Sequence, residues 1–336
     1  MIELIISNND AGQRLNKFLM KYLNEAPSSF IYKMLRKKNI VLNNLKAKGD
    51  EILVLGDSVK LYLADETITR FQSDNNNKQC DKAVTNKEIN KNTLVILYKN
   101  NDIIAVHKPA GVLSQKSKSS DYSINECIVD YYNTNISDSL YNQTFKPSVC
   151  NRLDRNTSGI ILAGISLKGS QMLSRMLKDR EADKFYFTIV KGDFKSRKRI
   201  TSYISKDGTQ NMSVVIGEAD YNKSKKYPEE YTRIETEFIP VSFSNGFTLL
   251  KIKLITGKSH QIRAQLKQLG FPIIGDTKYG DESCNRQMKK NFNLKNQLLH
   301  AGLVIMPDQT RIYDPLPEQF IMICNGLGLD IKNIEE

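Results

Sequence analysis

A strongly polar segment in the first third of the chain divides it into two parts of unequal size. The run Ser-Asp-Asn-Asn-Asn-Lys-Gln occupies residues 73–79, and further asparagines and lysines continue to Asn92. A stretch of this composition cannot bury enough apolar surface to offset the entropy that ordering costs. We therefore interpret residues 65–92 as a flexible linker. It separates a small amino-terminal module, residues 1–64, from a large body, residues 93–336.

The charge balance restricts the partners that such a chain can bind. Among 336 residues, 49 Lys and Arg outnumber 37 Asp and Glu, which gives a net charge of +12. A surplus of this size favours a polyanionic partner, either a nucleic acid or an anionic membrane surface. No apolar run in the sequence reaches the ~20 residues that a membrane span requires. We therefore expect no membrane insertion.

The composition also argues against secretion and against a structural metal site. Residues Met1–Ile5 have neither the basic flank nor the small-residue cleavage site of a signal peptide. The five cysteines form no Cys-x-x-Cys pair and only three histidines accompany them, so no zinc-type cluster is expected. Irregularly spaced free thiols are typical of a reducing compartment. We expect a cytoplasmic protein without a bound metal.

Two amphipathic helix patterns and short strands make up the amino-terminal module. Apolar side chains recur at helical spacing from Leu15 to Leu23, and Pro27-Ser28-Ser29 is a typical entry into a second helix. Short strands are predicted at residues 40–42 and 59–63. The polar face of the second helix is basic, with Lys33, Arg36, Lys37 and Lys38.

The body alternates strand and helix patterns without the regular βαβ rhythm of a parallel sheet. Ser244-Asn245-Gly246 joins two strand patterns as a hairpin signal. This order predicts an α+β fold with a mainly antiparallel or mixed sheet. The polar segments 204–228 and 281–297 are interpreted as surface insertions. Strands are predicted at residues 94–98, 103–106, 160–163, 185–190, 231–238 and 247–254, and helices at residues 124–132, 168–177, 259–269 and 318–325.

Four segments of the body combine glycine, proline and charge in ways that a plain sheet does not require. In one of them, Arg152-Leu153-Asp154-Arg155 lies on a turn that leads into an apolar strand. If the arginines approach Asp154, they would keep its carboxylate ionised with a lowered pKa. The alternative is a turn-capping Asp154 with both arginines in solvent. The others are His107–Gly111, Lys184–Tyr186 and Leu254–Arg263. Taken singly, the first is explained by a tight turn and the second by half-buried packing of its tyrosine. The third is explained by a capped helix start, which could bind a phosphate.

Nucleotide-binding motifs are absent from the sequence. There is no Gly-x-Gly-x-x-Gly after a strand, and Gly257-Lys258-Ser259 lacks the earlier glycine of a phosphate-binding loop. Nothing marks the sharp turn that presents a nucleophilic serine in hydrolases. The motifs therefore give no support for a nucleotide cofactor.

In this order, the four segments resemble the RluA-type family of RNA pseudouridine synthases over residues 94–325, most closely its RluC-like branch. Residues 13–63 are similar to the αL-type RNA-binding module that several members carry. The sequence departs from the usual family pattern at Asn151, Lys258 and Gln265, where members have His, Arg and His. The matching blocks are Lys108–Gly111, Arg152–Gly159, Lys184–Tyr186, Thr256–Arg263, Gly270–Asp276, Tyr279-Gly280 and Leu299–Ala301 with Pro307.

The resemblance implies a cofactor-free isomerase that converts uridine to pseudouridine in structured RNA. It implies that Asp154 is the catalytic carboxylate and that Arg263 pairs with it. Tyr186 would stack against the uracil, with its hydroxyl assisting the last deprotonation, and Arg152 would fill the vacated stack or hold the flipped nucleotide. Phosphates would be bound by Lys33, Arg36, Lys37 and Lys38 and by the basic run 195–199.

Several points stay open at this level. Large-subunit ribosomal RNA is the expected substrate, with transfer RNA as the alternative. A rival interpretation is an RNA-binding ribosome assembly factor whose catalysis has lapsed. Whether Asp154 adds to the ribose or removes its 2′ proton is also open. We expect a monomer.

Overall fold

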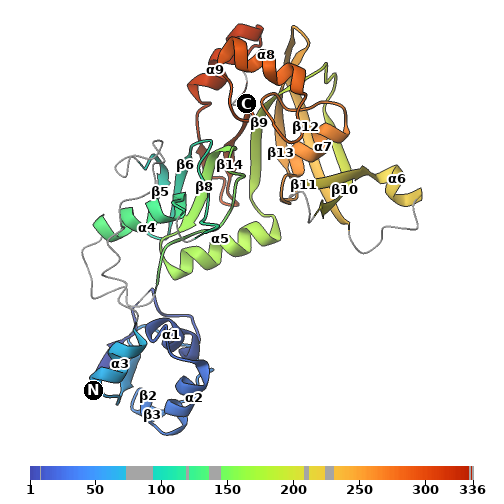
Figure 1. Ribbon diagram of the computed structural model, residues 1–336. Coiled ribbons are helices and arrows are strands. Elements are labelled where there is room, and N and C mark those ends of the chain that lie inside the picture. The colour runs from blue at the N-terminus through green and yellow to red at the C-terminus, as the bar shows by residue number, and fades with distance from the viewer. Residues whose placement is uncertain are drawn as a thin grey trace.

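The computed structural model describes residues 1–7, 9–72, 94–118, 121–135, 145–207, 212–223, 231–332 and 334. One buried apolar cluster draws only on residues from Leu4 to Ile68. The other clusters draw only on residues from Ile103 onward. Figure 1 shows these two parts, the first in blue and the second from green to red. Residues 73–92 of the predicted linker lie outside the described residues.

The amino-terminal part is an antiparallel sheet packed against helices. Its strand order is β1-β4-β2-β3, and the helices predicted near residues 15–23 and 28–36 are present. Leu15, Phe18 and Leu19 are buried, as the periodicity predicts, because they face the sheet. The elements are β1 (Ile2–Ile5), α1 (Leu15–Tyr22), α2 (Ser28–Arg36), β2 (Ile40–Leu42), β3 (Leu45–Lys46), β4 (Ser58–Leu61) and α3 (Asp65–Phe71).

Helix α3 corrects the predicted start of the linker at residue 65. Ile68 is buried in the core of the amino-terminal part, and the ring of Phe71 lies 4.7 Å from that of Phe30. Asp65 and Glu66 in the first turn and Arg70 in the last are placed favourably for the helix dipole. Ile68 and Phe71, three residues apart, thus anchor a helix in a segment whose polar composition had suggested a linker.

The body is built on an 11-stranded mixed sheet, which confirms the predicted α+β fold. The strands run in the order β11-β10-β12-β13-β9-β14-β8-β6-β5, and β7 and β15 pair with β8 and β14. Only β14 and β8 pair in parallel; the other described pairings are antiparallel. The strands are β5 (Ile96–Lys99), β6 (Ile103–Lys108), β7 (Ser148–Val149), β8 (Ser158–Gly164), β9 (Asp183–Lys191), β10 (Lys198–Asp207), β11 (Met212–Gly217), β12 (Thr232–Ser244), β13 (Phe247–Leu254), β14 (Leu299–Ile305) and β15 (Arg311–Tyr313).

Helices cover both faces of this sheet, which explains why its central strands are apolar on both sides. On β8, Ile161 packs into the cluster that contains residues of α4, while its neighbours Ile160 and Leu162 pack into the cluster that contains residues of α5. Residues of α7 and of α8 and α9 join clusters with the other half of the sheet. The helices are α4 (Ile124–Asn135), α5 (Leu167–Asp179), α6 (Glu218–Lys223), α7 (Gln261–Gln268), α8 (Glu282–Phe292) and α9 (Glu318–Leu327).

Both segments interpreted as surface insertions contain integral elements, so that interpretation is wrong. Strands β10 and β11 extend the sheet, with Ile204 and Val215 buried against Ile234 of β12. Helix α8 buries Cys284 and Met288 in the core. These elements bury only a narrow apolar stripe, and the neighbours that cover it are distant in sequence. Their local patterns are therefore weak.

Gly159, in the Arg152–Gly159 block, occupies a position that tolerates no side chain. Its φ is +124°, and a Cβ there would lie 2.3 Å from the carbonyl oxygen of Ala301 on β14. The close approach is the parallel pairing of β8 with β14, where Ala301 is the register partner of Gly159. A side chain at this point would separate β8 from β14.

We expect Gly159→Ala to destabilise the body by more than about 2 kcal/mol, because it combines backbone strain with a steric clash. Gly246→Ala is the matched control: its φ is +80°, but no atom lies within 4 Å of the added Cβ. Gly246→Ala should lower the free energy of unfolding by only about 1 kcal/mol. Urea denaturation followed by circular dichroism measures both. Equal losses for the two variants would show that the approach of β14 is unimportant.

Candidate active site

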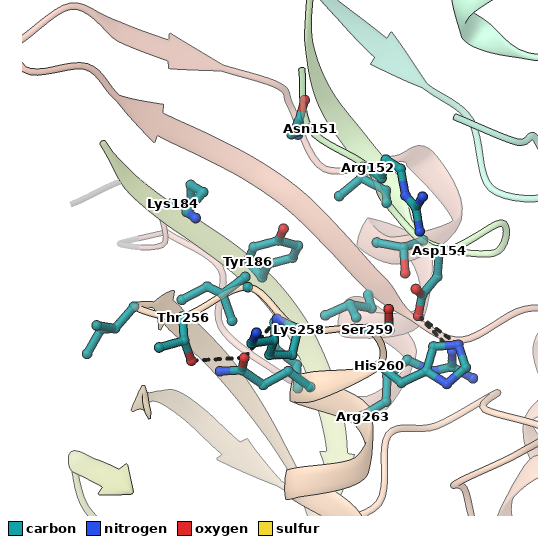
Figure 2. Close-up of a pocket in the computed structure, with 18 of the residues that line it drawn as sticks. Asn151, Arg152, Asp154, Lys184, Tyr186, Thr256, Lys258, Ser259, His260 and Arg263 are labelled. Atoms are coloured by element: carbon teal, nitrogen blue, oxygen red, sulfur yellow. Dashed lines mark hydrogen bonds and ion pairs between the residues drawn. The ribbon is translucent and has the colours of Figure 1, made fainter. Parts of the chain in front are cut away.

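A cleft with two adjoining cavities lies where the turn before β8, strand β9 and the loop before α7 meet. The first cavity has a volume of about 550 Å³ and the second about 590 Å³. The first is drawn in Figure 2. Asp154, His260 and Arg263 line both cavities, so they form the wall between them. Three segments that are distant in sequence thus converge on one carboxylate.

Buried hydrogen bonds hold the turn that carries Asp154. The side chain of Lys108 is fully buried and donates to the carbonyls of Pro109, Val112 and Arg155 at 2.8, 2.8 and 3.0 Å. Burial lowers the pKa of Lys108 to about 7, against the attraction of Asp154. Three acceptors still match the three N–H bonds of an ammonium group. The Lys-Pro-Ala-Gly segment is thus a tight turn, as its local pattern suggests. Its lysine side chain stabilises the neighbouring turn that carries Asp154, through the hydrogen bond to the carbonyl of Arg155.

Arg263 of α7 bridges two carboxylates. Its Nη1 atom donates to Oδ2 of Asp154 at 2.7 Å, while Nε and Nη2 donate to both oxygens of Asp276 at 2.7 and 2.9 Å. Arg263 is only 5% exposed and Asp276 only 1%. The bidentate pair orients the guanidinium so that its remaining edge faces Asp154. The predicted pair of Asp154 and Arg263 is therefore present in the structure.

Asp276 was not predicted as a site residue, although it lies in the Gly270–Asp276 block. Burial raises its pKa, but hydrogen bonds from Arg263 and from the backbone N–H groups of Lys278 and Tyr279 outweigh burial, and the net pKa is lowered. Asp276 therefore stays ionised and supplies a second negative charge to Arg263. The glycine that precedes Asp276 is the sequence feature that marks this position. Gly275 has a φ of +77° and turns the chain there.

Tyr186 points into the first cavity from a central strand. It pairs with Ile252 of β13 and with Ala301 of β14, so its position is set by neighbours on both sides. Burial and the nearby charge of Asp154 raise the pKa of Tyr186. Its phenol is therefore protonated at neutral pH. Figure 2 shows the ring between Lys184 and Asp154.

His260 adjoins Asp154 from the loop before α7. It caps the helix in the left-handed region with a φ of 56°, and its Nε2 atom lies 3.9 Å from Oδ2 of Asp154. Its Nδ1 atom lies 3.0 Å from the hydroxyl of Tyr279, which accepts a hydrogen bond from the backbone of Ser213. Burial lowers the pKa of His260, so the ring is neutral. Helix α7 begins at Gln261, two residues later than the predicted start.

The first cavity has a strong excess of positive charge. Among the residues that the structure describes, Asp154 is the one acidic side chain that lines it. Arg152 is exposed on the same turn as Asp154 and lines both cavities. This imbalance suits an anionic ligand. The lining arginines and lysines are Arg152, Arg180, Lys184, Lys258 and Arg263.

The predicted site residues therefore divide into two groups. Asp154, Arg152, Tyr186 and Arg263 come together around the first cavity. The four predicted RNA-binding cations lie in the amino-terminal part, where all are exposed: Lys33 and Arg36 on α2, Lys37 at its C-cap, and Lys38 after it with a φ of 60°, so Lys38 is not on the predicted helix face.

The basic run 195–199 is partly neutralised by carboxylates of β12. Arg197 donates to Glu237 at 2.7 Å, and Arg199 pairs with Glu235. These two arginines are therefore committed to cross-strand pairs on the sheet surface. This weakens the expectation that the run binds phosphates.

Two negative findings apply to the described part of the chain. No group of three or more His, Cys, Asp or Glu side chains there could hold a metal ion. No helix among those residues is both long and apolar enough to cross a membrane.

Comparison with known proteins identifies the family. A family model described as RNA pseudouridylate synthase matches residues 102–268. The "Ribosomal large subunit pseudouridine synthase C" of Buchnera aphidicola subsp. Baizongia pistaciae is 30% identical, over 98% of this chain and 95% of its own length. An uncharacterised RNA pseudouridine synthase of Mycoplasma genitalium is 28% identical over 91% of this chain and 89% of its own length.

A solved structure shows the same fold. "Human RNA Pseudouridylate Synthase Domain Containing 4" superposes with a TM-score of 0.58 at 18% identity, over 71% of this chain and 95% of its own. The geometry around Asp154 and the agreement with relatives along nearly the whole chain lead to one assignment. The chain belongs to the RNA pseudouridine synthase family, as an RluA-type member of the RluC-like branch.

Proposed function

We propose that this protein converts specific uridines of large-subunit ribosomal RNA to pseudouridine, with Asp154 as the catalytic carboxylate. The observation that carries the proposal is the placement of Asp154 between the buried cation of Arg263 and the cavity that contains Tyr186. The choice of substrate is supported by the name of the Buchnera relative, which matches along 98% of this chain. The protein would act as a cytoplasmic monomer without a cofactor.

Asp154 would act on the ribose of a uridine that has been turned out of the RNA. Breaking the glycosidic bond develops positive charge at the ribose, which a neighbouring carboxylate stabilises or traps. The side chain of Asp154 is 27% exposed, so it is accessible from the cleft while Arg263 holds one of its oxygens. The other oxygen, Oδ1, is left to face the sugar.

Arg263 and Asp276 would keep that carboxylate correctly oriented. A guanidinium that is bound on two edges cannot rotate, so Nη1 stays directed at Asp154. Such preorganisation avoids reorienting the group during the reaction.

Tyr186 and Arg152 would hold the extruded nucleotide. The ring of Tyr186 offers a stacking surface for uracil, and its protonated hydroxyl can donate a hydrogen bond to a base carbonyl. Arg152 is exposed beside Asp154 and could occupy the space that the flipped base leaves. Extrusion costs a few kcal/mol, which such contacts would offset.

The amino-terminal part would add affinity through its basic helix face. Lys33 and Arg36 lie on the side of α2 opposite its buried residues Ile31, Met34 and Leu35, and exposed Lys37 and Lys38 follow at the end of the helix. Lysine and arginine contacts of this kind bind phosphates without reading sequence.

Asp154→Asn tests the catalytic assignment, because it keeps the size of the side chain and removes its charge. We expect release of tritium from uridine labelled at C5 in ribosomal RNA to fall to background. RNA affinity should change by less than about 1.4 kcal/mol, a factor of ten, because phosphate contacts dominate binding. Asp193→Asn, at an exposed carboxylate, is the control and should leave turnover unchanged.

Other outcomes of that experiment would change the assignment. An active Asp154→Asn variant would remove Asp154 from its role. A wild-type protein that modifies transfer RNA but not ribosomal RNA would change the substrate. Tight RNA binding by the wild type without any isomerisation would favour an assembly factor.

Arg263→Ala should cost about 3–5 kcal/mol of stability, because it leaves Asp276 as an unpaired buried charge. Arg263→Lys should fold better but lose turnover by about 100-fold or more, since a point charge cannot bind both carboxylates at once. Urea denaturation and tritium release measure the two effects. The exposed Arg286 of α8 gives the control, and Arg286→Ala should cost no more than about 0.5 kcal/mol. A fully active Arg263→Lys protein would contradict the bridging role.

The basic residues of α2 and of the two positions after it can be tested in the full chain by changing Lys33, Arg36, Lys37 and Lys38 together to Gln. We expect weaker RNA binding. The slope of log K against log salt concentration should become smaller in magnitude by about 0.7–0.9 for each phosphate that the variant no longer neutralises. Turnover at saturating RNA should be unchanged. Changing the exposed lysines Lys178, Lys289, Lys290 and Lys295 together to Gln removes the same number of charges from the body and controls for net charge. An unaltered salt slope in the amino-terminal fourfold variant would exclude RNA binding by its four residues.

A further inference from the structure

Lys184 lies in the first cavity at the end away from Asp154. It precedes Tyr186 by two residues on β9, and alternate residues of a strand share a face, so both side chains line the cavity. Figure 2 shows Lys184 and Asp154 on opposite sides of Tyr186. The Nζ atom of Lys184 is 3.9 Å from the point where a Cβ on Gly257 would stand. The backbone at Gly257 thus lies beside the amine of Lys184.

The amine of Lys184 has no hydrogen-bond or ion-pair partner among the residues that the structure describes. Nearby lysines differ in this respect: Lys191 pairs with Asp281 at 3.0 Å, and Lys253 with Asp183 at 2.7 Å. Burial and the charge of Arg180 lower the pKa of Lys184. A half-buried cation without an acceptor is costly unless a ligand provides one.

The proposed reaction moves one negative charge along the cavity. When the bond between C1′ and N1 breaks, N1 keeps the electron pair and uracil leaves as an anion. Asp154 becomes neutral at the same time, either as an ester on C1′ or as an acid that holds the 2′ proton. C5 then bonds to C1′, which releases Asp154 or returns its proton to C2′. N1 gains a proton and C5 loses one, so charge and atoms balance.

We propose that Lys184 is a further catalytic residue, which binds a carbonyl of the uracil and stabilises the anion formed on cleavage. The proposal rests on the function proposed above. Figure 2 shows Tyr186 between Asp154 and Lys184. With the ribose at Asp154 and the base against Tyr186, the ring carbonyls that share the negative charge would therefore extend toward Lys184. Arg263 cannot take this role, because its hydrogen-bonding edges are committed to Asp154 and Asp276.

Lys184→Gln and Lys184→Arg test the proposal in the full-length protein. The measurement is single-turnover formation of pseudouridine in ribosomal RNA at saturating protein. We expect Lys184→Gln to slow the reaction by about 100-fold or more, the usual effect of removing a group that stabilises developing charge. Its RNA affinity should stay within about threefold of wild type. Lys184→Arg keeps the charge and should remain within about tenfold of the wild-type rate. Lys178→Gln, at an exposed lysine of α5, controls for loss of one charge.

The pH dependence gives a readout that a structural role would not produce. The amine must be protonated to stabilise the anion, so the wild-type rate should fall as pH rises through the lowered pKa of Lys184, below the ordinary lysine value of about 10.4. Arginine does not lose its proton in this range, so Lys184→Arg should abolish that fall. The other charged or titratable groups that line the cavity are Cys150, Arg152, Asp154, Arg180, Tyr186, Lys258, His260 and Arg263.

Two results would overturn the proposal. If Lys184→Gln binds RNA more weakly but reacts at the wild-type rate once saturated, Lys184 is a phosphate-binding residue. If Lys184→Arg keeps the high-pH fall of the wild type, another group causes it. A wild-type protein without any isomerisation would instead refute the proposed function, and this inference with it.

Discussion

Arg263 is almost completely buried, and its two ion pairs connect the elements that surround the cleft. A buried guanidinium is unfavourable unless its charge and its N–H groups are satisfied. Asp276 takes two of its hydrogen bonds, and Asp154 takes a third from the opposite side. Helix α7, the loop that follows it and the turn before β8 are thereby held at one separation. The orientation of the Asp154 carboxylate depends on this arrangement.

A second buried network supports the same turn from within the sheet. Ser158, at the start of β8, donates to Nδ1 of His300, whose Nε2 donates to the carbonyl oxygen of Asp314 at 3.0 Å. The carboxylate of Asp314 lies 2.6 Å from Nδ1 of His107. Burial lowers the pKa of His300, which is consistent with a neutral ring that accepts on one side and donates on the other. The start of β8, directly after the turn that carries Asp154, is thus fixed by buried hydrogen bonds.

Sequence reasoning succeeded where burial leaves a strong local pattern. Strand β8 is buried on both faces and is a continuous apolar run, and the hairpin between β12 and β13 turns at Asn245 and Gly246, both with positive φ. It failed at β10, β11, α3 and α8, where a few apolar residues are covered by neighbours distant in sequence. It also missed the roles of Asp276 and Lys108, because neither a buried ion pair nor a lysine that donates to backbone carbonyls produces a periodic pattern in the sequence.

By itself, the sequence determined the fold class and the family, and it singled out Asp154, Arg152, Tyr186 and Arg263 as candidates, because motif blocks and hydrophobic periodicity are local properties. The tertiary structure decided which of these groups touch and what charge each one meets. It placed Arg263 between two carboxylates and left Lys184 without an acceptor among the described residues. Pairing and desolvation arise only when distant segments pack together, and a linear pattern does not contain those distances.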